Sequence, residues 1–117
     1  MGRRAQSFLF ALNGIRFALR QPNFRIQLGA FVLALALAAI LRVTPSDWLA
    51  VILVSLAVLA AETMNTALET AVDLASPAFE PRARQAKDLA AGAVLLTAVA
   101  SVVVGAYVFV PRIAALV

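Results

Sequence analysis

The chain has 117 residues, of which 63% are apolar and 14% are charged, and its formal net charge is +4. A water-soluble domain is about 45–50% apolar and about 25% charged, and a domain this small cannot bury such a surplus of apolar side chains. The composition therefore indicates one membrane domain and excludes a disordered chain, a soluble enzyme fold and, since cysteine is absent, a disulfide scaffold.

The chemistry open to the chain is limited, because histidine is absent as well as cysteine. Thiolate and imidazole nucleophiles, zinc clusters and histidine-based proton transfer are thereby excluded. Carboxylates, amides, lysine and arginine must carry any reaction.

Residues 1–22 are predicted to form an amphipathic helix on the membrane surface. Phe8, Leu12, Ile15 and Leu19 recur at helical spacing while two arginines share another face, a pattern typical of an interfacial helix. The alternative is a basic flank that only sets the orientation. A signal peptide is disfavoured because 25 residues precede the first apolar run.

Three apolar segments follow, and we predict transmembrane helices over about residues 24–43, 47–73 and 87–110. The uncharged part of the third, residues 89–110, would extend about 33 Å at about 1.5 Å per residue, against a bilayer core of about 30 Å. The first two have shorter uncharged runs and must use flanking turns to cross.

Local signals predict where these helices end. Four prolines lie between or after the apolar segments, where they can start or end a helix, namely Pro22, Pro45, Pro77 and Pro111. Ser46 or Asp47 is expected to cap the second span, next to a tryptophan that can anchor it at the interface.

The basic residues predict the orientation. Eight of the ten precede the first span or lie between the second and third, and two lie on the other side. By the positive-inside rule, the N-terminus and residues 74–88 are cytoplasmic and the C-terminus lies outside.

An acidic stripe continues the second apolar helix. Glu62, Asn65, Glu69 and Asp73 are spaced by three, four and four residues, which places them within an arc of about 80° on one helix face. The alternative is a solvated face of a helix that has left the membrane, which suits Asp73 better than Glu62.

Glu62 is the deepest acid of the stripe. It lies 14 residues beyond Trp48, about 21 Å along the helix and short of a full crossing of about 30 Å. Facing lipid, an ionised carboxylate at that depth would cost up to about 2.5–3.5 kcal/mol. Glu62 is therefore expected to face a protein or aqueous cavity or to be protonated, and it is a candidate functional residue.

Carboxylates stacked on one face repel each other and need a cation. Mg²⁺ fits, because it prefers oxygen ligands and shares its shell with substrate phosphates. Lys87 and Asp88 lie where the third helix is expected to start, and a lysine there is expected to meet an anion, either the acidic stripe or a phosphate, or to be a positive-inside anchor. These features together predict phosphoryl transfer from a nucleotide to a hydroxyl in the membrane.

A small membrane transporter is a distant alternative, since one buried glutamate can couple protons to transport. Such a site would normally lie near the bilayer midplane, whereas these acids run toward one edge. A purely structural bundle would leave the acidic stripe unexplained.

Two segments resemble the signature of a known family. ETMNTALE at residues 62–69, followed by Asp73, and AKDLAAGAV at residues 86–94 resemble the E-x-x-N-[ST]-A-[IL]-E…D…A-K-D-x-x-[AS]-[AG]-A-V signature of the small bacterial diacylglycerol and undecaprenol kinases. The segments NGIR at residues 13–16 and NFRI at residues 23–26 also resemble that family.

The resemblance implies an integral lipid kinase of the bacterial inner membrane that uses ATP and Mg²⁺. It further implies homotrimers with active sites shared between subunits. The NFRI segment looks closer to the undecaprenol kinases, so undecaprenol is the favoured lipid substrate and diacylglycerol the alternative.

The resemblance also implies roles for individual residues. Glu62 would be the general base on the lipid hydroxyl, Asn65 would orient it or the γ-phosphate, and Glu69 would hold Mg²⁺. The residues that would bind ATP are Arg3 (or Arg4), Gln21, Glu69, Asp73, Glu80, Lys87 and Asp88. Two positions depart from the family: Gln21 stands where a second metal-binding glutamate is frequent, and Glu80 where a histidine is frequent.

Overall fold

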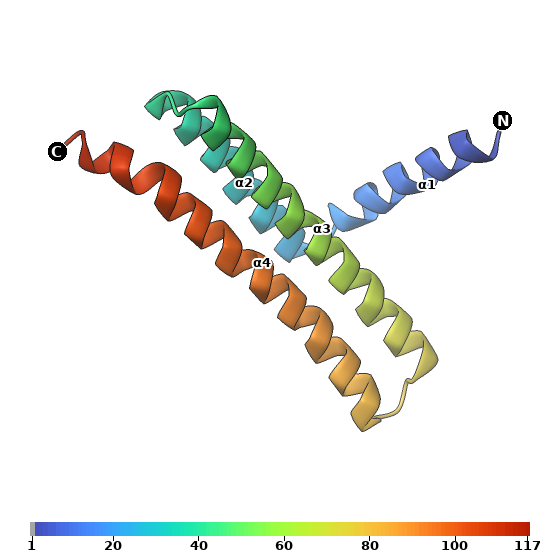
Figure 1. The fold of residues 1–117 in the computed structure, drawn as a ribbon. Helices are drawn as coiled ribbons and strands as arrows, with labels where there is room; N and C mark the ends of the chain where they lie inside the picture. Colours follow the sequence, from blue (N-terminus) through green and yellow to red (C-terminus); the bar gives the residue numbers. More distant parts are fainter. Residues whose placement is uncertain (1) are drawn as a thin grey trace.

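The computed structural model describes residues 2–117, which form four helices: α1 (Arg3–Ala18), α2 (Pro22–Leu41), α3 (Pro45–Ala75) and α4 (Pro81–Ala114). In Figure 1, α2, α3 and α4 lie along one another, whereas α1 projects from the bundle near the start of α2. By length and composition α2, α3 and α4 could each cross a membrane. The prediction of an all-helical chain with a shorter N-terminal helix and three candidate spans is confirmed; the position of α1 on a membrane surface stays a prediction.

The three long helices each begin with a proline in their first turn. Proline suits that position because its fixed φ is helical and its missing N–H would have no partner there. The helix that contains the acidic stripe begins at Pro45, and Thr44 caps it, with Oγ1 accepting a hydrogen bond from the Asp47 N–H at 3.2 Å. The expectation that Ser46 or Asp47 is the cap is wrong, because both already lie inside the first turn.

The expectation that Pro111 follows the last helix is also wrong, since α4 continues to Ala114. Proline removes one backbone donor from a helix but keeps its carbonyl. The Pro111 carbonyl accepts from the Ala115 N–H at 3.2 Å, so one more turn can form beyond it.

The turn between α2 and α3 is held by backbone geometry and by an arginine. Arg42 ends α2 in the left-handed region with φ 52°, and the Val43 N–H returns to the Ala38 carbonyl at 3.2 Å. Ala38 and Val43 are both buried, an apolar contact that often accompanies this type of helix end. From α4, the Arg112 guanidinium donates to the carbonyls of Leu41 at 3.3 Å and Arg42 at 2.9 Å.

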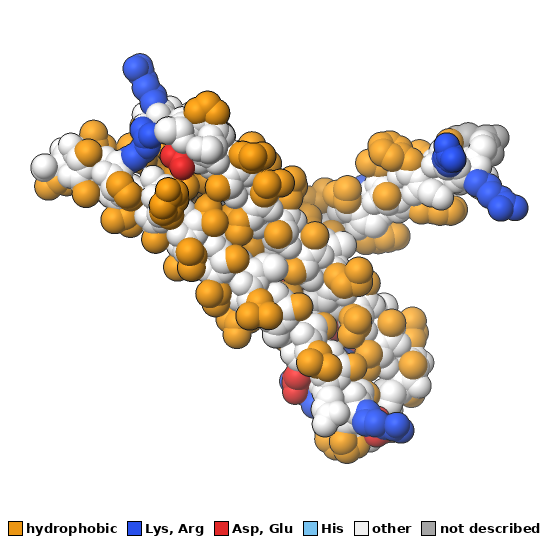
Figure 2. All heavy atoms as spheres, viewed as in Figure 1, with side chains coloured by type: hydrophobic (Ala, Val, Ile, Leu, Met, Phe, Trp, Pro, Cys, Tyr) orange, Lys and Arg blue, Asp and Glu red, His pale blue; other side chains and the backbone are white. Residues whose placement is uncertain are grey.

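Buried apolar side chains form two small clusters. One joins α2, α3 and α4 near the α2–α3 turn, and the other, around Phe24 and Leu59, lies where the end of α1 meets α2 and α3. Only 6–17% of each apolar span window is buried, and Figure 2 shows apolar side chains over most of the visible surface with charged groups at the ends. Lipid or further copies of the chain must therefore cover the outer faces of the bundle.

Replacing Arg42 with glycine is expected to stabilise the fold. The left-handed conformation costs a residue with a Cβ about 1–2 kcal/mol, and the greater freedom of glycine in the unfolded chain offsets about 0.5–1 kcal/mol of that gain. Arg42→Gly should therefore raise the free energy of unfolding in detergent micelles by about 0.5–1 kcal/mol. Arg42→Ala is the matched control; equal stabilities of the two variants would contradict the backbone explanation.

Candidate functional site

The C-terminal half of α3 carries many polar residues, but its threonines turn their hydroxyls back onto the helix. Thr63, Thr66 and Thr70 donate to the carbonyls of residues 59, 62 and 66 at 2.8, 3.1 and 2.9 Å. Their hydrogen bonds are thereby satisfied locally. The predicted acidic stripe is left as the polar face that α3 offers to other groups.

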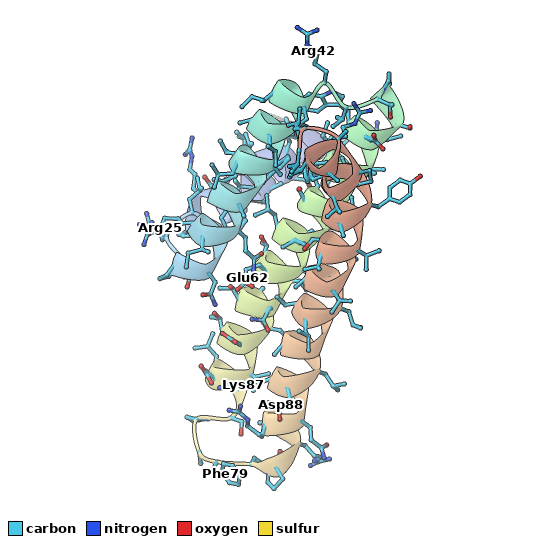
Figure 3. All side chains as sticks on the ribbon, turned by 90° about the vertical axis from the view of Figure 1, so that its left-hand side faces the viewer. Arg25, Arg42, Glu62, Phe79, Lys87 and Asp88 are labelled. Atoms are coloured by element: carbon cyan, nitrogen blue, oxygen red, sulfur yellow. The ribbon has the colours of Figure 1, made fainter. Side chains whose placement is uncertain are left out.

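Glu62 is buried, with 5% of its surface exposed, and α2 provides its partner. The Gln27 amide Nε2 donates to Glu62 Oε2 at 3.3 Å. The prediction that Glu62 faces protein rather than lipid thus agrees with its surroundings. Figure 3 shows Glu62 at the level of the Arg25 end of α2, with Lys87 and Asp88 further along α4 toward the α3–α4 turn.

The second buried polar residue, Asn65, lies almost one turn further along α3 and is 9% exposed. Its Nδ2 donates to Glu69 Oε1 at 3.2 Å, so an amide also fixes the next carboxylate. Within residues 2–117, the buried oxygens Gln27 Oε1 and Asn65 Oδ1 have no hydrogen-bond partner. Such carbonyl oxygens can only accept, so each is suited to a hydroxyl, a water molecule or a cation.

The outer part of the stripe is exposed and meets a lysine. Lys87 Nζ forms an ion pair with Asp73, and Arg84 pairs with Asp88 at 3.1 Å. Of the anions expected for Lys87, the stripe is therefore the one it contacts. The expectation that Lys87 lies at the start of a helix is wrong, because α4 begins at Pro81 and Lys87 lies beyond its first turn.

A cavity of about 170 Å³ lies at the α3–α4 turn, and four charged residues line it: Asp73, Glu80, Arg84 and Lys87. The structure thus brings together three of the residues predicted to bind ATP. Glu80 also caps α4, since its Oε2 accepts from the Ala83 N–H at 3.1 Å. Glu80, which stands where the family often has a histidine, therefore stabilises the start of α4.

Two predicted site residues lie apart from this group. Arg3 begins α1, whose free end projects away from the bundle in Figure 1. Gln21 is exposed at the N-terminus of α2. Across the described chain, no hydrogen bond or ion pair joins the side chain of Arg3 or Gln21 to the acidic stripe.

The described residues contain no group of three or more acidic, histidine or cysteine side chains placed to hold a metal ion. A single chain therefore does not assemble a complete protein shell from the predicted ligands Glu69 and Gln21. Glu69 and the unpartnered Asn65 Oδ1 do offer the oxygen donors that Mg²⁺ prefers, and this ion commonly completes its shell with water and substrate phosphates.

Gln27 is the site residue that was not predicted from the sequence. A signal was present, because Gln27 is the one polar side chain between Arg25 and Arg42. That Gln27 contacts Glu62 depends on how α2 and α3 pack. The spacing of residues within either helix does not determine this packing.

The sequence of the chain is similar to those of known kinases. The family profile described as "Prokaryotic diacylglycerol kinase" matches residues 9–109, which include the acidic stripe, Lys87 and Asp88. A diacylglycerol kinase of Synechocystis sp. is 38% identical over 112 residues, which are 94% of this chain and 64% of that protein. This chain thus spans just under two thirds of the length of the Synechocystis protein.

Two other relatives are matched over more of their length. The undecaprenol kinase of Bacillus subtilis is 32% identical over 114 residues, covering 97% of this chain and 93% of that protein. A diacylglycerol kinase of Sinorhizobium sp. is 34% identical over 101 residues, covering 86% and 74%. The identities are similar, so they do not separate the two named activities.

The ion pair between Lys87 and Asp73 is expected to contribute little to stability. The Lys87 side chain is 29% exposed and that of Asp73 is 64% exposed, and such pairs contribute about 0.2–1 kcal/mol. Lys87→Met, Asp73→Asn and the double variant should give a coupling energy below about 1 kcal/mol in micellar unfolding. A coupling of several kcal/mol would mean that the pair holds α3 to α4 and that Lys87 is not free to bind a ligand.

Proposed function

The chain belongs to the prokaryotic diacylglycerol kinase family, a family of lipid kinases, and we propose that it transfers the γ-phosphoryl group of ATP to the hydroxyl of undecaprenol. The observation that carries the proposal is the buried carboxylate of Glu62, held by Gln27 within the bundle. Because the chain belongs to a kinase family, the kinase hypothesis is favoured over the transporter hypothesis.

Glu62 is proposed to be the general base. As the lipid hydroxyl oxygen attacks the γ-phosphorus, its proton passes to Glu62, the new P–O bond forms, and the bond to the β-phosphate oxygen breaks to release ADP. The proton then leaves Glu62 for water. A carboxylate inside the apolar part of the bundle can meet a hydroxyl that is attached to a membrane lipid, whereas the exposed acids beyond it cannot reach as deep.

ATP is proposed to bind toward the α3–α4 turn, where Asp73, Glu80 and Lys87 line one cavity. Lys87 exchanges its contact with Asp73 for the phosphates, while Asp88 remains beside Arg84. Glu69 and Asn65 would hold Mg²⁺, which neutralises the negative charge of the phosphates when bound. Asn65 already orients Glu69 through its amide N–H, so its carbonyl is free for this use.

Undecaprenol is proposed in preference to diacylglycerol on the NFRI segment at residues 23–26. Both lipids present a primary hydroxyl, so the reaction itself is the same.

We further propose that the active form is a homotrimer with its N-terminus in the cytoplasm. The separation of Arg3 and Gln21 from the acidic stripe within one chain is consistent with sites completed by a neighbouring copy. The exposed apolar faces of the spans provide surface for such an assembly.

Purified protein with γ-labelled ATP and Mg²⁺ is expected to phosphorylate undecaprenol faster than diacylglycerol when both lipids are offered in parallel micelles. The readout is label in the extracted lipid. Faster labelling of diacylglycerol would reassign the substrate, and no labelling of either lipid would overturn the proposed function.

Glu62→Gln is expected to reduce lipid phosphorylation by about 10²–10⁴-fold, because the amide cannot accept the hydroxyl proton. Binding of ATP should remain within about twofold, since Glu62 lies apart from the proposed nucleotide residues. Asp47→Asn is the matched control, as it makes the same chemical change beside Arg112 near the α2–α3 turn. Activity of Glu62→Gln equal to that of the control would refute the base assignment.

A further inference from the structure

Gln27 connects α2 to the buried carboxylate of α3 through one end of its amide. Its Nε2 donates to Glu62, while its Oε1 is buried and has no partner within residues 2–117. An ionised carboxylate only accepts hydrogen bonds, so the NH₂ end must face it and the carbonyl must face away. This orientation provides the Glu62 carboxylate with a donor.

The general base of a kinase must exist in two forms in every turnover. It is a carboxylate before transfer and a carboxylic acid after it. At a buried site each form needs a hydrogen-bond partner, because an unmatched polar group there is costly. The protonated oxygen of the acid donates and therefore needs an acceptor, whereas both oxygens of the carboxylate accept.

The surroundings of Gln27 allow it to meet both needs. Gln27 is one of the residues that line a cavity of about 270 Å³ between α2, α3 and α4, so its side chain borders open space as well as packed atoms. Turning the amide by half a rotation about its last side-chain bond would break only the contact with Glu62, since Oε1 has no other partner to lose. Side-chain amides rotate about this bond in a broad, roughly two-fold potential.

Gln27 is the side chain that contacts the Glu62 carboxylate, and the other buried carbonyl oxygen without a partner among the described residues, Asn65 Oδ1, belongs to the residue proposed above to hold Mg²⁺. Within the described chain, the Gln27 amide is the group that the Glu62 carboxylate hydrogen-bonds, and no ion pair reaches it. Thr66 binds the Glu62 backbone carbonyl rather than the side chain. Ser101, which lines the same cavity, already donates to the Ala98 carbonyl at 2.7 Å.

We propose that Gln27 is the positioning residue for Glu62 in both protonation states: its N–H donates to the carboxylate before transfer, and its carbonyl, after the amide turns, accepts from the acid afterwards. The inference rests on the proposed role of Glu62 as base. The proton that the acid holds comes from the lipid hydroxyl and is later released to water, so the amide gains and loses none. The 3.3 Å contact is long, as hydrogen bonds of catalytic groups often are before substrate binds.

Two variants separate this role from simpler ones. Gln27→Met keeps length and volume but can neither donate nor accept in place of the amide, and it should lower kcat by about 10- to 100-fold. Gln27→Lys offers a stronger donor to the carboxylate but no acceptor to the acid, and it should lower kcat at least as much. The KM for ATP should stay within about twofold in both, and Ser101→Ala, in the same cavity, should keep kcat within about twofold of the original chain.

Full activity of Gln27→Met would overturn any role for the amide. Full activity of Gln27→Lys would overturn the two-state role and leave only a donor to the carboxylate. No lipid phosphorylation by the unmodified protein would instead refute the proposed function, which is a different outcome.

An infrared titration tests the contact without requiring turnover. The carboxylic acid band of Glu62 is identified by its loss in Glu62→Gln. In Gln27→Met this band should move to higher frequency than in the unmodified protein, because the acid has lost its acceptor. The same comparison shows whether the variant is folded, since a helical amide band accompanies it. An unchanged acid frequency would overturn the proposal.

Discussion

The fold depends on one constraint, which is that a carboxylate inside an apolar helix bundle must be given its hydrogen bonds by the protein. Unpaired buried charges cost several kcal/mol even after relaxation. Glu62 receives its donor from Gln27, so α2 and α3 pack with these two residues opposite one another. The nearby threonines use their own helix for hydrogen bonding, so they make no competing demand.

The acidic face of α3 passes from the interior of the bundle to water. Glu62 and Asn65 are buried, whereas the Asp73 side chain is 64% exposed and meets Lys87. A lipid hydroxyl lies at the membrane and a nucleotide is dissolved in water. A helix that extends beyond the bundle offers polar groups to both environments. Figure 3 shows this sequence of positions, from Glu62 beside α2 to Lys87 and Asp88 nearer the turn. In the proposed site, the buried end would meet the lipid hydroxyl and the exposed end would meet the nucleotide.

Much of this could be predicted from the sequence, because it depends on periodicity and composition. The apolar runs indicated three spans, and the spacing of Glu62, Asn65 and Glu69 identified a shared face. The partner of Glu62 could not be predicted, because it depends on how two helices pack. The early start of α4 was missed because the cap at Glu80 and the proline after it outweigh the charge pattern of the loop. The predicted metal ligand Gln21 likewise gave no contact with Glu69 within one chain, since it lies on a different helix at an exposed end.

In the proposed mechanism, catalysis requires the Glu62 carboxylate in the position where it contacts Gln27. Single-turnover formation of phospholipid from γ-labelled ATP in Glu62→Asp tests this most directly, because the variant keeps the charge and withdraws it by one methylene group. We expect unchanged ATP affinity and a transfer rate lower by about 10²-fold, the loss expected when a reacting group is misplaced by about 1 Å. A transfer rate equal to that of the unmodified protein would contradict this mechanism.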